Sequence, residues 1–363
     1  MLVKGSAKLP TVKNAILLIQ LGDIGDVVLT MPTIQALRES FPTRKLLVCV
    51  REKAREIIAD CPWTDGVIAL NSQQMNLGEY FHYQWHFFQT LRSYHFDWAI
   101  ELRTGTRGAI LTFFSGAPTR TGRYARDGQL WRNRVFTHLV NPVNEEGQYV
   151  AEHCLNIISP FGLAVKSPIP SLTVPSHRKK KALEIFKQEQ IPVDRPIIAF
   201  HPFSLWKYKE LDIEQCIQLV DHITIKYGAP VILTGAPEER TRAEKVMQEC
   251  GRPVFNLAGR TSVGELSAIL QTCSLFIGVD TAALHIAAAV GTPTIGIFGP
   301  SSPRSWAPRG EKHTVVFKNM HCVPCRQKGC QNTEISRCLK ELNIEEIMEK
   351  VDSHIAQVGV AFA

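Results

Sequence analysis

Asp280 and His285 are the first candidates for chemistry, because both lie at one end of a short helix in the segment 274–300. The segment alternates a buried apolar run, a turn, alanine-rich residues and a second apolar run, which predicts a strand, a helix and a strand. We expect Asp280 to cap the helix and Gly291 to end it. Free N–H groups and the helix dipole at that end favour a phosphate. An ordinary cap and a packed histidine are the alternative.

A second candidate turn lies near the N-terminus. An apolar run over residues 15–21 predicts a strand, a helix is expected from about Val27, and the turn between them carries Asp23 and Asp26. A carboxylate at such a position suits general-base catalysis. The turn lacks the GxGxxG spacing of a dinucleotide-binding motif, which argues against a nicotinamide cofactor.

Two more strand-to-helix turns follow in the second half of the chain. The motif HPFSLWKYK brings a hydroxyl, Ser204, and an amine, Lys209, ahead of a helix that we expect Asp212 to cap with Gln215. Glu239 stands at the start of the next helix, where it either complements the helix dipole or binds a ribose hydroxyl. These turns together favour a ligand with phosphate and ribose groups.

Basic charge is concentrated between residues 103 and 134, where seven arginines face a single acid. Guanidinium groups bind phosphate and carboxylate in a bidentate manner, so this segment suits an acceptor molecule that carries such groups, for example on a sugar. A solvated basic face is the alternative. Nucleic acid is disfavoured, because the segment has no aromatic-interleaved run, zinc finger or helix-turn-helix signature. The arginines that we assign to the acceptor are Arg103, Arg107, Arg120, Arg123 and Arg126.

Composition is that of a folded protein with two domains. The chain has 363 residues, 45% hydrophobic and 21% charged, and a net charge of +7 that suggests an anionic partner. Residues 1–12 lack the apolar run of a signal peptide, and no run approaches the length of a membrane span. Ten cysteines without a secretion signal suggest a reducing cytoplasm.

Strands and helices alternate in two halves. We expect strands near 15–21, 45–50, 67–70, 97–102 and 118–122 in the first half, and at 196–200, 230–235, 254–257, 274–279 and 294–298 in the second. A proline-rich stretch, residues 167–180, predicts the linker. The expected domains are residues 1–170 and 171–340, followed by a C-terminal segment, 341–363, whose helix we expect to pack on the first domain. This pattern predicts two parallel-sheet α/β domains of the Rossmann-like kind.

The ordered set of motifs resembles glycosyltransferase family 9, the ADP-heptose:lipopolysaccharide heptosyltransferases. The motifs are GDxxxxxP from Gly25, the HPFSLWKYK loop, TGAPEE, LAGRTSVGEL and DTAALHIAAAVGTPTIGIFGP, and they extend through most of the chain. Ala282 departs from the glycine that many members have after the Asp-Ser/Thr pair. With HPxxxWxxK upstream, this departure is similar to the type that adds the branching third heptose.

The resemblance implies the GT-B fold and inverting transfer of heptose from ADP-heptose to the lipopolysaccharide inner core. It implies that Asp26 is the general base, with Asp23 as a competitor, and that Lys209 meets the charge of the leaving ADP. We expect the reaction to need no cofactor or metal, because no acidic or histidine cluster lies beside the phosphate-binding loops in the sequence. The missing signal peptide and membrane span, together with the arginine bias, predict a cytoplasmic protein with peripheral contact at the anionic inner face of the inner membrane, where the resemblance implies a lipid-anchored acceptor. The donor-binding residues that the resemblance implies are Ser204, Glu239, Asp280, Thr281, Ala282 and His285.

Two alternatives remain for the function, and a zinc site is an alternative to the absence of a metal. A GT-B epimerase or hydrolase would use the same nucleotide site without a large acceptor face, and a non-catalytic sugar-nucleotide-binding protein would keep the fold alone. Four cysteines near the C-terminus begin with a C-x2-C pair that suits a zinc knuckle, but the spacing of the rest is not that of a zinc ribbon. We therefore assign no metal to Cys322, Cys325, Cys330 and Cys338.

Overall fold

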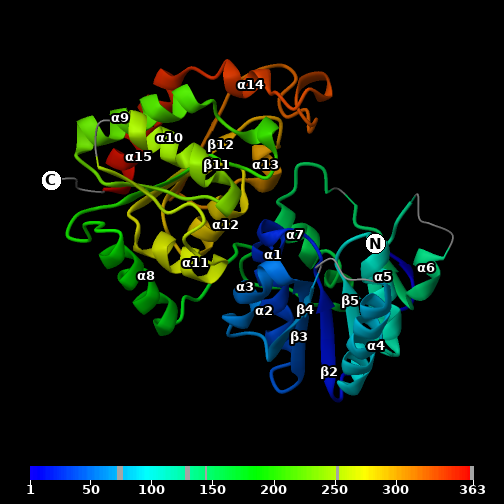
Figure 1. Cartoon of the computed structure of the whole chain (residues 1–363). Coiled ribbons are helices and arrows are strands. Elements are labelled where there is room, and N and C mark those ends of the chain that lie inside the picture. Colours follow the sequence, from blue (N-terminus) through cyan, green and yellow to red (C-terminus); the bar gives the residue numbers. More distant parts are fainter. Residues whose placement is uncertain (72–76, 127–130, 144, 251–252, 360–363) are drawn as a thin grey trace. The chain divides into compact units, whose positions relative to one another are not determined.

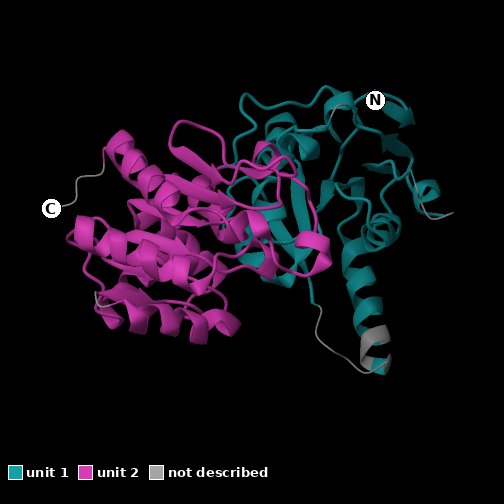
Figure 2. Ribbon diagram, turned by 90° about the horizontal axis from the view of Figure 1, so that it is seen from above, with its two compact units in different colours: residues 1–170 teal, residues 171–363 magenta. Residues whose placement is uncertain are grey.

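The computed structural model describes residues 1–71, 77–126, 131–143, 145–250 and 253–359. The chain divides into two compact units, residues 1–170 and 171–363, coloured separately in Figure 2. Each unit has its own parallel sheet and its own buried core. The boundary lies within the proline-rich stretch. The following helix, α8, begins at Ser176, inside the stretch predicted as linker, because the last proline, Pro175, stands at its N-cap and leaves a run free of proline.

The sheet of unit 1 has the order β1-β7-β6-β5-β2-β3-β4 and is parallel except for β1, which pairs antiparallel with β7. The central strand β2 is buried along its whole length, as expected for a parallel sheet covered on both faces. Sequence reasoning found the five longer strands and missed β1 and β7, which are only three residues each. The strands are β1 Leu2–Lys4, β2 Ala15–Ile19, β3 Lys45–Arg51, β4 Gly66–Leu70, β5 Phe96–Glu101, β6 Thr119–Arg123 and β7 His138–Val140.

The single helix expected from about Val27 is two helices. The first starts earlier than predicted, at Ile24, and the second begins at Met31 with Pro32 in its first turn, where a proline needs no N–H partner. Helices α4 and α5 lie side by side in Figure 1. The helices of unit 1 are α1 Ile24–Val28, α2 Met31–Ser40, α3 Arg55–Ala59, α4 Leu77–Ser93, α5 Thr106–Phe114, α6 Arg132–Val135 and α7 Val150–Leu155, with 3-10 turns η1 Glu52–Ala54 and η2 Ser159–Phe161.

The sheet of unit 2 has the order β10-β9-β8-β11-β12-β13 and is parallel throughout. Its strands agree with the sequence prediction to within three residues at each end, except β13, which was not predicted. The strands are β8 Ile198–His201, β9 Val231–Leu233, β10 Val254–Asn256, β11 Leu275–Val279, β12 Thr294–Phe298 and β13 His313–Phe317.

The helices of unit 2 cover both faces of its sheet: α9, α10 and α15 lie on one side, and α8, α11 and α12 on the other (Figure 1). We expected the last helix, α15, to pack on the first domain, but it belongs to unit 2. Its residues Ile347, Val351 and Ile355 are part of the unit 2 core, beside α9. The helices are α8 Ser176–Gln188, α9 Ile213–Tyr227, α10 Arg240–Glu249, α11 Val263–Thr272, α12 Ala282–Ala289, α13 Pro303–Trp306, α14 Arg337–Lys340 and α15 Ile344–Val358, with 3-10 turns η3 Lys207–Lys209, η4 Pro237–Glu239 and η5 Cys330–Asn332.

Candidate active site

In unit 1, the strand order reverses between β2 and β5, which are hydrogen-bonded neighbours although β3 and β4 separate them in the chain. Ligands bind at the carboxyl ends of strands at such a switch point. Asp26 follows β2 and Arg103 follows β5, and Oδ2 of Asp26 lies 3.0 Å from Nη1 of Arg103. The aspartate side chain is 17% exposed and the arginine 48% exposed. The structure thus pairs two residues that the sequence suggested separately.

Local backbone geometry holds Asp26 in place. Its Oδ2 accepts the N–H of Asp23 at 2.9 Å, closing a capping box around α1. Gly22 packs directly against this carboxylate, and a Cβ at that position would come within 2.4 Å of Oδ2. Residue 22 must therefore be glycine for Asp26 to keep this orientation.

Asp23, the competitor for the catalytic role, has different surroundings. Its carboxylate is half exposed and pairs with Lys53 at 2.5 Å and with Arg51 at 3.5 Å. Partial burial raises its pKa, but the hydrogen bond from Lys53 and the nearby positive charges outweigh burial and lower the pKa below its usual value. The carboxylate of Asp23 is therefore already paired with two cations, which makes it a weaker candidate for the general base than Asp26.

A buried ion pair that sequence reasoning missed supports Arg103. Glu101, at the end of β5, and Arg132 are at most 3% exposed, and Nη2 of Arg132 lies 2.6 Å from Oε2 of Glu101. The carboxylate of Glu101 accepts the backbone N–H of Arg103. Arg132 donates to the backbone carbonyl oxygen of Arg103 at 2.8 Å. Burial raises the pKa of Glu101, opposed by these cations. A carboxylate that ends a buried strand, as in FDWAIE, was the available signal.

The remaining arginines divide into two groups. Arg120 donates to the carbonyl oxygens of Val135 and Ala117, and Arg123 forms a bidentate pair with Glu145, so both stabilise the fold. These contacts argue against the predicted acceptor role of the two residues. Arg107 and Arg126 are exposed, as a ligand-binding role requires.

In unit 2, the strand order reverses between β8 and β11. Lys209 lies in the loop after β8 and Asp280 directly follows β11, and Nζ of Lys209 lies 2.6 Å from Oδ2 of Asp280. Nε2 of His285, on the first turns of α12, is 3.9 Å from the other carboxylate oxygen. The prediction that Asp280 caps α12 is wrong: Thr281 occupies the N-cap and the helix begins at Ala282. The carboxylate instead turns toward the lysine.

Burial sets the electrostatics of this cluster. Asp280 is only 5% exposed, and burial raises its pKa, but Lys209, His285 and a hydrogen bond from Ser301 outweigh burial and hold the pKa below its usual value. The hydroxyl of Thr281 is buried and has no hydrogen-bond partner among the described residues. A buried polar atom at the N-terminus of a helix is an available donor for an anionic ligand.

The loop between β8 and α9 depends on a carboxylate that the sequence did not single out. Glu210 accepts the N–H of Ser204 at 2.8 Å and pairs with Arg242, which also lies over the ring of Phe203. The Ser204 hydroxyl accepts the N–H of Trp206. The expected cap at Asp212 is confirmed. Glu210 therefore fixes the loop that carries Lys209.

Glu239 lies in η4, which follows β9, and β9 is a neighbour of β8 in the sheet. Its Oε2 accepts the N–H of Ala236 at 2.7 Å, which closes η4. Burial and nearby acidic groups raise its pKa. Glu239 thus accepts a backbone N–H in the first turn, a contact that the sequence did not suggest; its effect on the helix dipole and a ribose contact both stay predictions.

No group of three or more His, Cys, Asp or Glu side chains with the geometry of a metal site occurs among the described residues, the four C-terminal cysteines included. The described part of the chain also contains no helix that is both long and apolar enough to cross a membrane. Metal independence stays a prediction.

Known proteins resemble this chain in sequence and in fold. The model of the family described as glycosyltransferase family 9 (heptosyltransferase) matches residues 84–336. A lipopolysaccharide heptosyltransferase 3 of Escherichia coli is 29% identical over 292 residues, covering 78% of this chain and 83% of the relative. A family 9 glycosyltransferase from Veillonella parvula superposes with a TM-score of 0.82 at 18% identity, covering 97% of this chain and all of that chain. An E. coli heptosyltransferase solved with ADP gives a TM-score of 0.73 at 17% identity, covering 94% and 99%.

The fold is accordingly GT-B, as predicted, with two parallel-sheet α/β domains. The family match covers more than half of the chain and includes the loops that carry Lys209 and Asp280. The chain is a glycosyltransferase and belongs to glycosyltransferase family 9, the heptosyltransferase family.

Proposed function

We propose that this enzyme transfers heptose from ADP-heptose to the inner core of lipopolysaccharide with inversion at the anomeric carbon. The observation that supports this most is the ion pair of Lys209 with buried Asp280 beside the N-terminus of α12. A cation and free backbone N–H groups at one switch point suit a diphosphate. The ADP-bound relative and the heptosyltransferase names of the relatives point to the same donor.

In the proposed reaction, unit 1 binds the acceptor and unit 2 binds the nucleotide. An acceptor hydroxyl gives its proton to the carboxylate of Asp26 while its oxygen attacks the anomeric carbon. The bond from that carbon to the β-phosphate oxygen breaks, and ADP leaves with the electron pair. Arg103 keeps Asp26 oriented, and together with the exposed Arg107 and Arg126 provides positive charge for an anionic acceptor.

Lys209 provides more of the leaving-group stabilisation than the helix end. At an effective dielectric constant of about 20, a cation about 4 Å from a phosphate oxygen contributes about 4 kcal/mol, against roughly 0.3–2 kcal/mol for the helix dipole. Asp280 holds the amine at 2.6 Å, so the lysine is positioned before the donor arrives. Ser204, Thr281, Ala282 and His285 complete the proposed donor site, with Glu239 at the ribose.

Two observations favour addition of the third, branching heptose. Ala282 stands where many family members have glycine, and the relative that is 29% identical is a heptosyltransferase 3. The acceptor of such an enzyme is anchored in a membrane, so we place the reaction in the cytoplasm, at the inner face of the inner membrane.

The direct test is incubation with ADP-heptose and heptose-deficient lipopolysaccharide cores, followed by mass spectrometry. The expected product is a core heavier by one heptose, with one ADP released for each transfer. ADP-glucose and UDP-sugars serve as donor controls. Free heptose without a heavier core would indicate a hydrolase, an isomerised donor would indicate an epimerase, and ADP binding without any product would indicate a non-catalytic protein.

A further inference from the structure

An exposed group of aromatic side chains lies on α4 and α5 of unit 1, outside the candidate active site. Trp85 is 65% exposed, Phe113 52% and Phe114 38%. The rings of Phe88 and Phe114 stack with centroids 4.4 Å apart, and Phe113 meets Phe114 edge-on at 5.5 Å. Trp85 is three residues before Phe88 and therefore lies on the same face of α4. We call these four residues the aromatic patch; Phe88 is half-buried against the core and the other three are exposed. Exposed large apolar side chains that group together mark an interaction surface.

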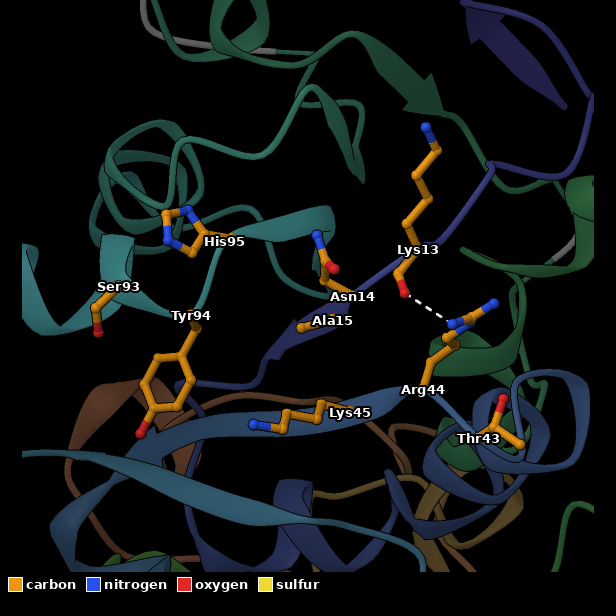
Figure 3. Close-up of a pocket in the computed structure, with 9 residues that line it drawn as sticks. All are labelled: Lys13, Asn14, Ala15, Thr43, Arg44, Lys45, Ser93, Tyr94 and His95. Carbon is orange, nitrogen blue, oxygen red and sulfur yellow. Dashed lines mark hydrogen bonds between the residues drawn. The ribbon is translucent and has the colours of Figure 1, made fainter.

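A basic pocket of about 500 Å³ lies beside the C-terminal end of α4. Three segments line it, residues 13–15, 43–45 and 93–95, where β2, β3 and β5 begin (Figure 3). Its charged side chains are Lys13, Arg44 and Lys45, and His95 is the fourth basic group. The pocket thus lies at the amino ends of the strands, at the opposite edge of the sheet from Asp26.

The acids near this pocket are already engaged. Oδ2 of Asp97 accepts the backbone N–H groups of three successive residues, 13–15. Asp65 pairs with Arg38 and accepts the N–H of Leu46. Neither carboxylate is among the residues that line the pocket. The lining side chains therefore carry a net positive charge.

Arg92 connects the two features. It stands one residue before the pocket segment 93–95, and its side chain lies close to Gly116, just beyond the end of α5; a Cβ on that glycine would be 3.9 Å from it. Aromatic side chains and cations therefore adjoin at one end of α4 and α5. Aromatic rings favour the interface between lipid tails and headgroups, and cations favour anionic headgroups.

We propose that the aromatic patch and the basic pocket form the face by which this enzyme docks on an anionic phospholipid bilayer, with a lipid phosphate in the pocket. This inference rests on the proposed function only because that function requires a lipid-anchored acceptor. Docking there leaves the carboxyl edge with Asp26 and Arg103 open to the acceptor. A two-fold dimer through this face is disfavoured by charge, because it would bring two basic pockets together.

Sedimentation with vesicles tests the docking face without any donor or acceptor. The probe is vesicles of phosphatidylglycerol and phosphatidylethanolamine, compared with vesicles of phosphatidylcholine. We expect wild-type protein to bind the anionic vesicles and to be released as salt rises. Trp85→Ser with Phe113→Ser should weaken binding at least tenfold. Lys13→Ser with Lys45→Ser should weaken it by about fivefold for each lysine removed.

The matched control has Ile225→Ser and Lys187→Ser, two exposed residues of unit 2, and should bind like the wild type. All variants should keep normal turnover with a delipidated, soluble core oligosaccharide. A wild-type enzyme that is inactive on every core would refute the proposed function, but the result of the vesicle assay would not change, because that assay contains no donor or acceptor. Three outcomes overturn the docking face: patch variants that bind like the control, binding insensitive to salt and lipid charge, or a wild-type dimer that patch variants dissociate in analytical ultracentrifugation.

Discussion

Replacing Lys209 by methionine separates its effect on the nucleotide from its effect on the fold. The substitution removes a cation from the proposed diphosphate site and leaves the 5% exposed carboxylate of Asp280 without its partner. Breaking a buried ion pair from one side costs about 3–5 kcal/mol. Lys209 is 21% exposed and His285 lies 3.9 Å from the carboxylate, so we expect the free energy of unfolding to fall by about 2–3 kcal/mol.

A second substitution distinguishes the two effects. Asp280→Asn in the Lys209→Met background removes the unpaired charge and should restore most of the stability. It should not restore ADP affinity, because the cation is still missing. We expect ADP to bind roughly 10–150-fold more weakly to both variants and adenosine to bind almost normally. This loss of ADP affinity is smaller than the Coulomb energy of about 4 kcal/mol between one cation and one phosphate oxygen.

The stability of the wild type and that of the Lys209→Met variant should depend on pH with opposite signs. In the wild type, the pKa of Asp280 is lowered in the folded state, so its contribution is present above the unfolded pKa of about 3.9 and is lost as pH falls through the folded value. Without Lys209, burial should raise that pKa above the unfolded value. The folded variant then binds the proton more tightly, so lowering the pH from 7 to 5 should stabilise it relative to the wild type.

The assays are isothermal titration with ADP and with adenosine, and urea unfolding between pH 5 and 8. Lys207→Met is the matched control, since Lys207 is exposed two positions away and should leave both ligands and stability unchanged. Equal losses of ADP and adenosine affinity, or recovery of ADP affinity in the double variant, would show that Lys209 acts only through the fold.

Three further predictions concern the reaction and unit 1. Asp26→Asn should lower turnover by roughly 10²–10⁴ and leave ADP affinity within a few-fold, while Asp23→Asn should do much less; near-normal turnover of the first variant in the mass-spectrometric assay contradicts the role of Asp26. Arg132→Met should lower the free energy of unfolding by about 3–5 kcal/mol, because it leaves Glu101 buried without its cation; a change under 1 kcal/mol in urea would contradict this. Activity should survive EDTA, and loss that magnesium or manganese reverses would show that a metal takes part.

Local sequence determined the strands and the turns that carry polar residues. Parallel strands covered on both faces must be apolar along their length, so runs such as residues 275–279 and 294–298 were recognisable without knowledge of their neighbours. The motifs at the following turns were sufficient to predict the family and the GT-B fold. The strands that escaped prediction are β1, β7 and β13; β1 and β7 have only three residues each, which is too few to show a periodic pattern.

Only the tertiary structure decided which polar residues meet. Asp280 looked like a helix cap, but the order of the strands puts β8 next to β11 and brings Lys209 to its carboxylate across 71 residues of chain. The arginines between residues 103 and 134 were equivalent as a charge bias, and only burial and long-range partners separate Arg132, which supports the fold, from Arg103, which reaches Asp26. Local propensity carries no information on strand order, and strand order sets which carboxyl-end turns become neighbours.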